Sequence, residues 1–327
     1  MPKTQKQIVE VDGRELALSN LDKVYFPATG FTKGEVIHFY SEIAEILLPH
    51  LHDRPLTMKR YPEGVLGEHF YEKNAPKHTP EWVKRFAVAH HDGRGPEVQF
   101  ILCNDRATLL WVTNLGDIEK HVLLARVPRL NFPTSIVFDL DPGEPAGLLE
   151  CCRVALHLRE MLAVWNLEAF VKVSGSKGLH LNVPLNSETP YELAQPFAKA
   201  VAELAAQRLP SEVVSEMAKT LRGGKVLIDW SQNSDFKTTV SVYAMRAKGG
   251  EPFVSMPVTW SEVENAVKRK SAKALSFSPV AAIKRLAKMG DLFEPALTLR
   301  QELPAAFTKA LSASPPVKLS RWPRNKK

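Results

Sequence analysis

The sequence has little cysteine and no hydrophobic run long enough to cross a membrane. Its three cysteines include the adjacent pair Cys151 and Cys152, which offers neither a disulfide framework nor the ligand spacing of a zinc site. We expect buried, unreactive thiols in a reducing compartment. The polar residues 1–7 lack the apolar core of a signal peptide. These absences predict a soluble, cytoplasmic protein with no membrane partner.

A strong excess of one charge is also missing from most of the chain. The formal net charge is +7. Five of the positive charges lie in residues 312–327, a stretch without acids, at Lys318, Arg321, Arg324, Lys326 and Lys327. We expect this proline-rich basic tail to be disordered, and either solvated or loosely in contact with DNA. The rest of the chain is nearly neutral, so a nucleic-acid site must be argued from local clusters of cations.

The chain does contain enough apolar sequence for a large core, because 44% of its 327 residues are hydrophobic and 24% are charged. Apolar periodicity and turn signals predict strands at 56–60, 86–90, 98–103, 118–127, 135–139, 170–173, 179–183 and 225–229. Helices are expected near 106–114, 146–165 and 190–208. Further helices should begin at Thr259, which has capping-box spacing to Glu262, and at Ser278, which precedes Pro279.

This order of elements predicts an α/β (α+β) fold, a two-layer core in which helices flank a small, partly antiparallel sheet. We divide the chain into an N-terminal tail at 1–12, one domain at 13–311 and the disordered tail at 312–327. Within the domain, we separate an N-terminal α/β part at 13–130, a middle part at 131–250 and a helical C-terminal part at 251–311.

Two acidic residues one position apart end the apolar run Ser135-Ile-Val-Phe-Asp-Leu-Asp-Pro142. Residues i and i+2 of a strand face the same side, so Asp139 and Asp141 bring two negative charges together unless cations lie between them. Mg²⁺ and Mn²⁺ prefer oxygen ligands, and a pair of such ions can hold the attacking and leaving oxygens of a phosphoryl displacement. Asp229 ends another apolar run and is the best candidate for a third ligand. The alternative is a simple turn, since Asp, Pro and Gly all favour turns.

A loop of small residues, Ser174-Gly-Ser-Lys-Gly178, joins two of the expected strands. Its bare backbone amides could surround an anion, Lys177 would add a point charge, and the Ser174 hydroxyl could donate to a phosphate oxygen. His180 lies just past the loop, within reach of a phosphate or sugar oxygen. A tight turn with an exposed lysine is the alternative. Because the loop follows Asp139 and precedes Asp229 in the chain, it indicates a triphosphate site.

Two features of the first part suit a DNA strand. Thr32 and Glu35 have capping-box spacing, which puts Lys33 in the first turn of a helix, where a bound phosphate would offset its unfavourable position in the helix dipole. A solvated Lys33 is the alternative. Phe70 and Tyr71 cannot both enter one core from a straight strand, so one should be exposed near Lys59, Arg60 and Lys73, as a base-stacking surface requires. A two-sided strand packed by helices is the alternative.

An ordered set of motifs closely resembles the polymerase domain of bacterial end-joining ligase D, a branch of the archaeo-eukaryotic primase superfamily. These motifs are Phe138-Asp-Leu-Asp-Pro-Gly-Glu144, Ser174-Gly-Ser-Lys-Gly-Leu-His180 and Ile228-Asp-Trp-Ser-Gln-Asn233. The similarity runs from residue 9 or so to the region of residue 300. It implies a primase-like catalytic core, in which residues 13–130 would be the DNA-binding part and residues 131–250 the catalytic part.

The resemblance also implies roles for individual residues. Asp139, Asp141 and Asp229 would bind two divalent metal ions, Mn²⁺ by preference or Mg²⁺. The nucleoside triphosphate would be held by Ser174, Lys177, His180, Arg222, Arg246, His121 and Gln232. Lys23 and Lys33 would grip the 5′-phosphate at a gap or break, and the template would lie on Phe70, Tyr71, Lys59 and Arg60. Relatives usually have two phenylalanines at the stacking pair, and Tyr71 keeps the ring while adding a hydroxyl.

The predicted function is a DNA repair polymerase that adds nucleotides, ribonucleotides by preference, to a primer 3′-hydroxyl at 5′-phosphorylated gaps or broken ends. One alternative is a primase that starts strands on single-stranded template. Another is a non-catalytic DNA-end-binding module, which the three acids argue against. A different nucleotidyltransferase class has Gly-Ser before Asp-x-Asp, the reverse of the order found here. We see no ligase or nuclease segment and expect a separate DNA ligase, a Ku-type end-binding partner and association with the nucleoid.

Overall fold

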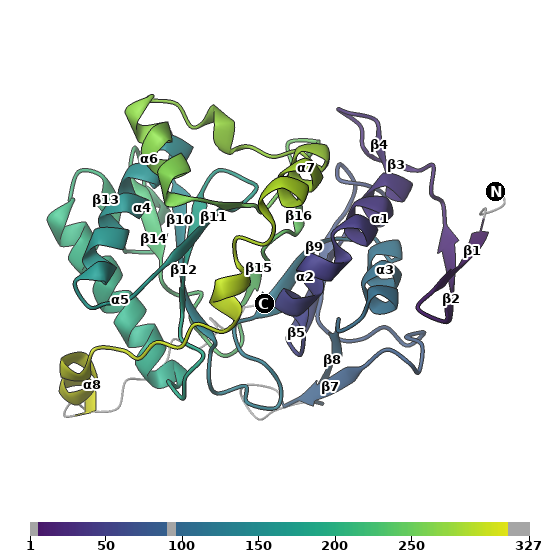
Figure 1. Ribbon diagram of the computed structural model, residues 1–327, viewed down its shortest axis with the longest axis horizontal. Coiled ribbons are helices and arrows are strands. Elements are labelled where there is room, and N and C mark those ends of the chain that lie inside the picture. The colour runs from purple at the N-terminus through teal and green to yellow at the C-terminus, as the bar shows by residue number, and fades with distance from the viewer. Residues whose placement is uncertain (1–5, 90–95, 313–327) are drawn as a thin grey trace.

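Two six-stranded sheets organise the computed structural model, which describes residues 6–89 and 96–312 (Figure 1). The central sheet has the strand order β13-β14-β10-β12-β11-β18, and all its pairs are antiparallel except β13 with β14. Its strands are β13 (Val213–Val214), β14 (Val226–Asp229), β10 (Ser135–Pro142), β12 (Leu179–Pro184), β11 (Phe170–Val173) and β18 (Pro257–Val258).

The side sheet is antiparallel and has the order β15-β9-β5-β8-β7, with β6 paired to β5. Its strands are β15 (Thr238–Val240), β9 (Asp117–Leu123), β5 (Pro55–Arg60), β8 (Val98–Leu102), β7 (Arg85–Val88) and β6 (Phe70–Glu72). Three hairpins complete the strands: β1 (Lys6–Val11) with β2 (Arg14–Ser19), β3 (Val24–Phe26) with β4 (Phe31–Thr32), and β16 (Met245–Lys248) with β17 (Glu251–Val254).

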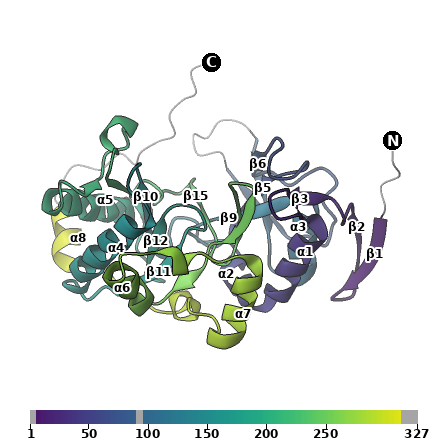
Figure 2. The same ribbon diagram turned by 90° about the horizontal axis from the view of Figure 1, so that it is seen from above.

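Each sheet and the helices packed around it form one half of the molecule, and the two halves lie side by side in both views (Figures 1 and 2). The central sheet carries α4 (Leu148–Ala163) and α5 (Tyr191–Arg208), while α6 (Trp260–Lys268) packs on α4 and α8 (Ala305–Ser312) packs on α5. The side sheet carries α1 (Lys33–Glu42), α2 (Ala44–Leu51) and α3 (Arg106–Asn114). Helix α7 (Pro279–Met289) contacts α1 and β17, and short 3-10 turns lie at Lys219–Leu221, Lys273–Leu275 and Glu294–Leu297.

Local sequence signals explain where several helices begin. Thr32 caps α1 and Thr259 caps α6, each in a reciprocal capping box with the glutamate three residues later. Ser278 caps α7, which has Pro279 at its first position and ends at Gly290 with a positive φ of 66°. The apolar faces of both halves join in one continuous core, in which all three cysteines are buried and unpaired. These starts and the inert cysteines confirm the sequence predictions.

Three expectations need correction. Lys6–Val11, assigned to a tail, pairs with β2 along its whole length. The strand expected to reach residue 127 ends at Leu123, because the chain turns so that Ala125 bridges Pro133 and Val127 donates to the carbonyl of Asp53. Finally, β15 belongs by sequence to the catalytic part but pairs with β9, so the division at residue 130 does not separate the sheets.

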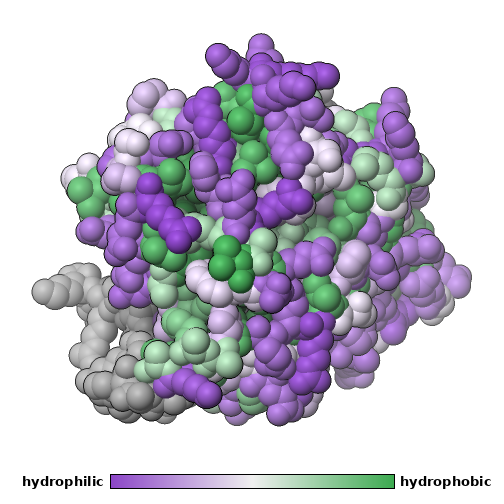
Figure 3. Space-filling model, turned by 60° about the vertical axis from the view of Figure 1, so that its left-hand side comes forward, coloured by the Kyte–Doolittle hydropathy of each residue, from purple (hydrophilic) through white to green (hydrophobic). Residues whose placement is uncertain are grey.

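The surface matches a chain with many charged residues. Hydrophilic residues cover most of the face in Figure 3, with smaller hydrophobic areas between them. Among the described helices, none has both the length and the apolar character that a membrane span requires. The tail predicted to be disordered lies almost wholly outside the described residues.

Candidate active site

A row of polar side chains crosses four neighbouring strands of the central sheet. Asp139 on β10 is the register partner of Asp229 on β14 and of His180 on β12, and His180 is in turn the partner of Lys172 on β11. Directly opposite residues of antiparallel strands project to the same face, so all four side chains share one side of the sheet. Asp141, two residues after Asp139, faces the same side. The structure therefore places the three predicted acids on one face of the sheet, on two strands that are distant in sequence.

Each of these carboxylates already has a partner. The Nε2 atom of His180 lies 3.3 Å from Asp139 Oδ1, and an Arg222 nitrogen lies 3.4 Å from Asp141 Oδ2. Asp229 accepts hydrogen bonds from the backbone and hydroxyl of Ser231, at 2.8 and 2.6 Å. Within residues 6–89 and 96–312, no three acidic, histidine or cysteine side chains are grouped closely enough to hold a metal ion.

The three acids nevertheless fit a divalent cation by chemistry. Their oxygens are the ligands that Mg²⁺ and Mn²⁺ prefer, and the strand register holds all three on one face. An ion bound there would compete with Arg222, His180 and Ser231 for the carboxylate oxygens. Their role as metal ligands stays a prediction.

Two basic residues, His180 and Lys172, lie beside Asp139 on the strands away from Asp229. Burial raises the pKa of Asp139, but the neighbouring His180, Lys172 and Arg246 outweigh this effect and hold the pKa below its usual range. Burial lowers the pKa of Lys172 to about 7, helped by Arg246. Lys172 donates to the Ser255 hydroxyl at 2.6 Å and to the carbonyl of Val240 at 3.3 Å. The row therefore joins an acidic end at β14 to a basic end at β11.

The loop between β11 and β12 starts on this face. Ser174 is buried, and its hydroxyl oxygen accepts a hydrogen bond from the Gly178 amide at 3.3 Å, which leaves the hydroxyl hydrogen for another acceptor. A Cβ atom at Gly178 would lie 1.9 Å from the carbonyl oxygen of Leu140, so only glycine fits there. Lys177 is exposed and pairs with Glu144 at 2.5 Å. A shallow pocket beside it is lined by Glu144, Lys177 and the start of α4.

The remaining nucleotide candidates fall into two groups. Arg222 and Gln232 contact the acids directly, since Gln232 Nε2 donates to Asp229 Oδ2 at 3.1 Å. Arg246 and His121 instead gather around Glu119 of the side sheet, at 2.7 and 3.4 Å. Arg246, on the β16–β17 hairpin, also donates to the carbonyl of Ser174 at 3.0 Å, so it links Glu119 of the side sheet to the loop.

The aromatic pair lies on the edge strand β6. Phe70 and Tyr71 are 44% and 58% exposed, because β6 pairs only with β5. Arg60 lies over the ring of Phe70 at 5.4 Å, and Lys59 over that of Tyr71 at 5.6 Å. The sequence predicted one exposed ring, and the structure exposes both. The alternative of a strand packed on both faces is therefore wrong.

The two lysines predicted to grip a phosphate are neighbours. Lys33 is only 4% exposed and donates to the carbonyl of Ser19 at 2.7 Å, so the alternative of a solvated side chain is wrong. Burial, with a smaller contribution from the positive charge of Lys23, lowers the pKa of Lys33 to about 8. Lys23 donates to Glu63 at 2.6 Å and to the carbonyl of Pro62 at 2.8 Å. A phosphate at Lys23 would compete with Glu63.

The sequence argument missed two charged residues of this region, Lys172 and Glu119. Both lie in strands that were predicted to be apolar, and both are buried. Lys172 interrupts the run Phe170-Val-Lys-Val173 two positions before Ser174, and Glu119 begins a run of three polar residues inside β9. A charged residue within an otherwise apolar strand was the available signal, since buried charges require partners.

Known proteins are similar to this chain over most of its length. Residues 32–293 match the family described as LigD, primase-polymerase domain. The multifunctional non-homologous end joining protein LigD of Mycolicibacterium smegmatis is 39% identical over 285 residues, which cover 85% of this chain and 35% of that protein. The bifunctional LigD of Bacillus subtilis is 32% identical over 255 residues, covering 77% of this chain and 40% of that protein. The chain thus spans between a third and two fifths of these relatives.

A solved structure is similar as well. The polymerase domain from Mycobacterium tuberculosis ligase D in complex with DNA superposes with a TM-score of 0.80 at 37% sequence identity. The match covers 86% of this chain and 98% of that one. The α/β architecture expected from the sequence is therefore confirmed by a solved relative.

Proposed function

This chain belongs to the LigD primase-polymerase family, and from that premise we propose that it is a DNA repair polymerase of non-homologous end joining. It adds nucleotides to a primer 3′-hydroxyl at 5′-phosphorylated gaps or broken ends. One observation carries the proposal: the register of β10 and β14 aligns Asp139 with Asp229 on the face where the Ser174 loop begins.

The three acids would hold two divalent metal ions, which supply charge neutralisation at the attacking and leaving oxygens of nucleotidyl transfer. The residues around them bind and orient the triphosphate. The Ser174 hydroxyl and the Lys177 ammonium would contact phosphate oxygens, and Arg246 would add a charge from the β16–β17 hairpin. His180, fixed between Asp139 and Lys172, would donate to a phosphate or sugar oxygen. Arg222, Gln232 and His121 complete the nucleotide site.

The DNA would lie across the side sheet. Lys23 and Lys33 would take the 5′-phosphate, because two neighbouring cations suit a group with a charge close to −2. The template would stack on Phe70 and Tyr71, with Lys59 and Arg60 beneath their rings. The described hydrogen bonds of the Lys33 ammonium go to the neutral oxygens of Ser19, so a phosphate would add the opposite charge that this buried cation lacks.

Several finer properties belong to the same proposal. We expect Mn²⁺ in preference to Mg²⁺, and ribonucleotides in preference to deoxyribonucleotides. A separate DNA ligase would seal the product, and a Ku-type protein would hold the ends. A DNA substrate would bring the protein to the nucleoid, in the cytoplasm.

The test is single-nucleotide extension on a gapped duplex, with and without the 5′-phosphate, comparing both sugars under each metal. We expect extension that depends on a divalent metal, is faster with the 5′-phosphate, and is absent on single-stranded template alone. Synthesis on single-stranded template without a primer would favour a primase. DNA binding without any extension would favour an end-binding module, and either result would overturn the proposal.

A further inference from the structure

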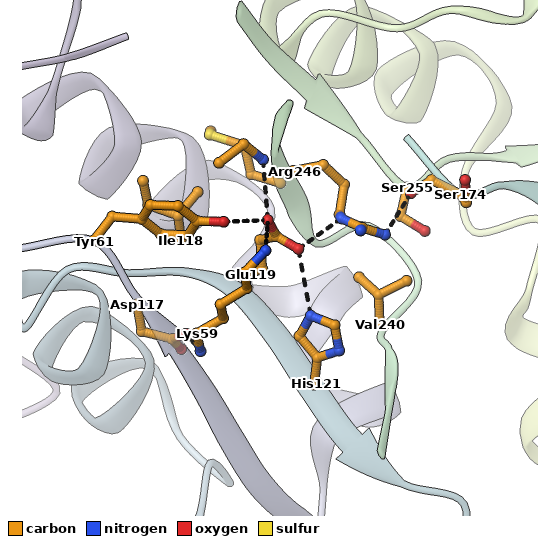
Figure 4. Close-up of polar contacts among 12 residues, drawn as sticks. Lys59, Tyr61, Asp117, Ile118, Glu119, His121, Ser174, Val240, Arg246 and Ser255 are labelled. Carbon is orange, nitrogen blue, oxygen red and sulfur yellow. Dashed lines mark hydrogen bonds and ion pairs between the residues drawn. The ribbon is translucent and has the colours of Figure 1, made fainter. Parts of the chain in front are cut away.

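One buried carboxylate joins the two halves of the proposed site. Glu119 lies in the middle of β9 and is 1% exposed. Figure 4 draws it at the centre of a cluster, with Tyr61 and Lys59 on one side and Arg246 and His121 on the other. None of the sequence motifs assigned a function to this residue.

The two oxygens of Glu119 face different parts of the molecule. Oε1 lies 3.0 Å from the Lys59 ammonium, 2.7 Å from the Tyr61 hydroxyl and 3.3 Å from the Ala247 amide. Oε2 lies 2.7 Å from the Nε atom of Arg246 and 3.4 Å from His121 Nε2. Oε1 thus faces β5, the strand that pairs with the strand of Phe70 and Tyr71. Oε2 faces Arg246 and His121, which we assign to nucleotide binding.

The electrostatics of the cluster keep Glu119 charged. Burial alone would raise the pKa of Glu119, but the His121 hydrogen bond and the charges of Arg246 and Lys59 outweigh it and lower the pKa. Lys59 and Arg246 can only donate, so each needs an acceptor once it is removed from water. Glu119 is the acidic side chain that both of them contact in the part of the chain described here.

Arg246 contacts the loop Ser174–Gly178 as well as Glu119. While its Nε faces Glu119, its Nη1 donates to the Ser174 carbonyl at 3.0 Å. The loop crowds against it as well, since a Cβ atom at Gly175 would come within 2.7 Å of Arg246 Cγ. The guanidinium is therefore held through both Nε and Nη1, and its remaining N–H groups are left to bind a ligand.

We propose that Glu119 is a positioning residue, which sets the Arg246 guanidinium for the incoming triphosphate and fixes it relative to Lys59 and the template strand. The inference rests on the proposed function, because it takes Arg246 to contact the triphosphate. Glu119 itself touches neither nucleotide nor DNA and acts through Arg246. An anion bound at Arg246 would thus meet a guanidinium whose direction is already set by Glu119 of the side sheet.

The variant Glu119→Gln removes the negative charge of the side chain but keeps its size and shape. A glutamine has one acceptor oxygen and one NH₂ group, so in either orientation its NH₂ faces an obligate donor, Arg246 on one side or Lys59 and the Ala247 amide on the other. Asp117→Asn is the matched control, because Asp117 is a buried acid of the same strand that contacts Lys120 and the Lys59 backbone but not Arg246. Thermal melting of each variant verifies that it is folded.

The decisive measurement is a double-mutant cycle on nucleotide binding. The dissociation constant of a nucleoside triphosphate analogue with an uncleavable α–β bridge is measured by calorimetry on the protein with gapped DNA, and kcat/KM for extension is measured in parallel. We expect Glu119→Gln to weaken analogue binding by about 10- to 100-fold, as for a charged buried group that loses its acceptor. We expect the double variant with Arg246→Ala to bind within about 3-fold of Arg246→Ala alone, because the two residues act together.

Each result has a consequence. If the Glu119→Gln and Arg246→Ala effects multiply in the double variant, or if folded Glu119→Gln binds the analogue like the wild type, the inference is wrong. An equal loss in Asp117→Asn would assign the effect to general destabilisation of β9 and would also overturn it. Binding of the analogue without any extension by the wild type would refute the proposed polymerase while the cycle still decides on Glu119. No analogue binding by the wild type would refute both.

Discussion

Lys33 offers a sharp prediction, because burial changes its charge within an accessible pH range. Its pKa is lowered to about 8, first by burial and then by Lys23. A 5′-phosphate beside it would stabilise the protonated form, so binding above pH 8 must include the uptake of a proton. Affinity for the phosphorylated end should then fall with rising pH. The phosphate itself has its second pKa near 6, so it does not titrate above pH 7.

The size of the effect follows from the contact and from the titration. A hydrogen bond to a charged group contributes about 1.5–3 kcal/mol, so Lys33→Gln should reduce the preference for a 5′-phosphorylated gap by roughly 10- to 100-fold. With a pKa of about 8, Lys33 of the free protein changes from mainly protonated at pH 7 to mainly neutral at pH 9. The wild-type preference should therefore approach that of Lys33→Gln as the pH rises.

The assay is a fluorescence titration of gapped duplexes with and without the 5′-phosphate, from pH 7 to pH 9, for both proteins. Lys268→Gln controls for the loss of one positive charge, because Lys268 is an exposed residue at the end of α6. A wild-type preference that does not change with pH, or a Lys33→Gln protein that keeps it within twofold, would show that the phosphate is bound elsewhere.

Three further predictions concern the template surface, the phosphate loop and stability. Tyr71→Ala should weaken binding of single-stranded template by about 1–3 kcal/mol in a fluorescence titration while Tyr71→Phe stays near wild type, and equal affinities of all three proteins would rule out stacking. Gly178→Ala should lower nucleotide incorporation by at least about 10-fold, since its Cβ would meet the Leu140 carbonyl. The control Gly223→Ala should behave as wild type, because residue 223 has open space around it. Similar incorporation rates for both variants would contradict the close approach of Gly178 to Leu140. His50→Gln should reduce the free energy of unfolding by about 1–3 kcal/mol, because it removes the imidazole that lies 2.7 Å from Asp291 Oδ2, while Tyr243 and Phe293 still donate to Oδ1. Burial raises the pKa of Asp291, but the hydrogen bonds to its carboxylate, first that from His50, outweigh burial and lower the pKa. The wild type should therefore lose this stability as the pH falls through the lowered pKa. An identical pH dependence of thermal melting in His50→Gln would refute the stabilising role of the His50–Asp291 pair.

Local signals in the sequence were sufficient for much of the fold. The capping residues Thr32, Thr259 and Ser278 fixed the starts of three helices, because a cap depends only on residues within one turn. The i and i+2 spacing of Asp139 and Asp141 likewise fixed their common face on any extended strand. Asp229 could be proposed as the third acid only from its strand-end position and the family motif, and the register of β14 against β10 then brought it opposite Asp139.

Pairings between distant segments were beyond local reasoning. The three-residue strand β15 joins β9, although its sequence gives no sign of which sheet it enters. Lys172 and Glu119 were overlooked for the same reason. A buried charge is stable only beside its partners, and these partners, Ser255 and Arg246, come from segments more than 80 residues further along the chain.

The central claim is that three carboxylates on two strands act as one site, and a single set of variants tests it most directly. Extension of a gapped, 5′-phosphorylated duplex is measured with Mn²⁺ and with Mg²⁺ for Asp139→Asn, Asp141→Asn and Asp229→Asn, beside Glu160→Gln, an exposed acid of α4, as control. We expect each aspartate variant to bind DNA like the wild type but to lose extension with either metal, and the control to remain active. Near-normal extension by any one of the three aspartate variants would contradict the account.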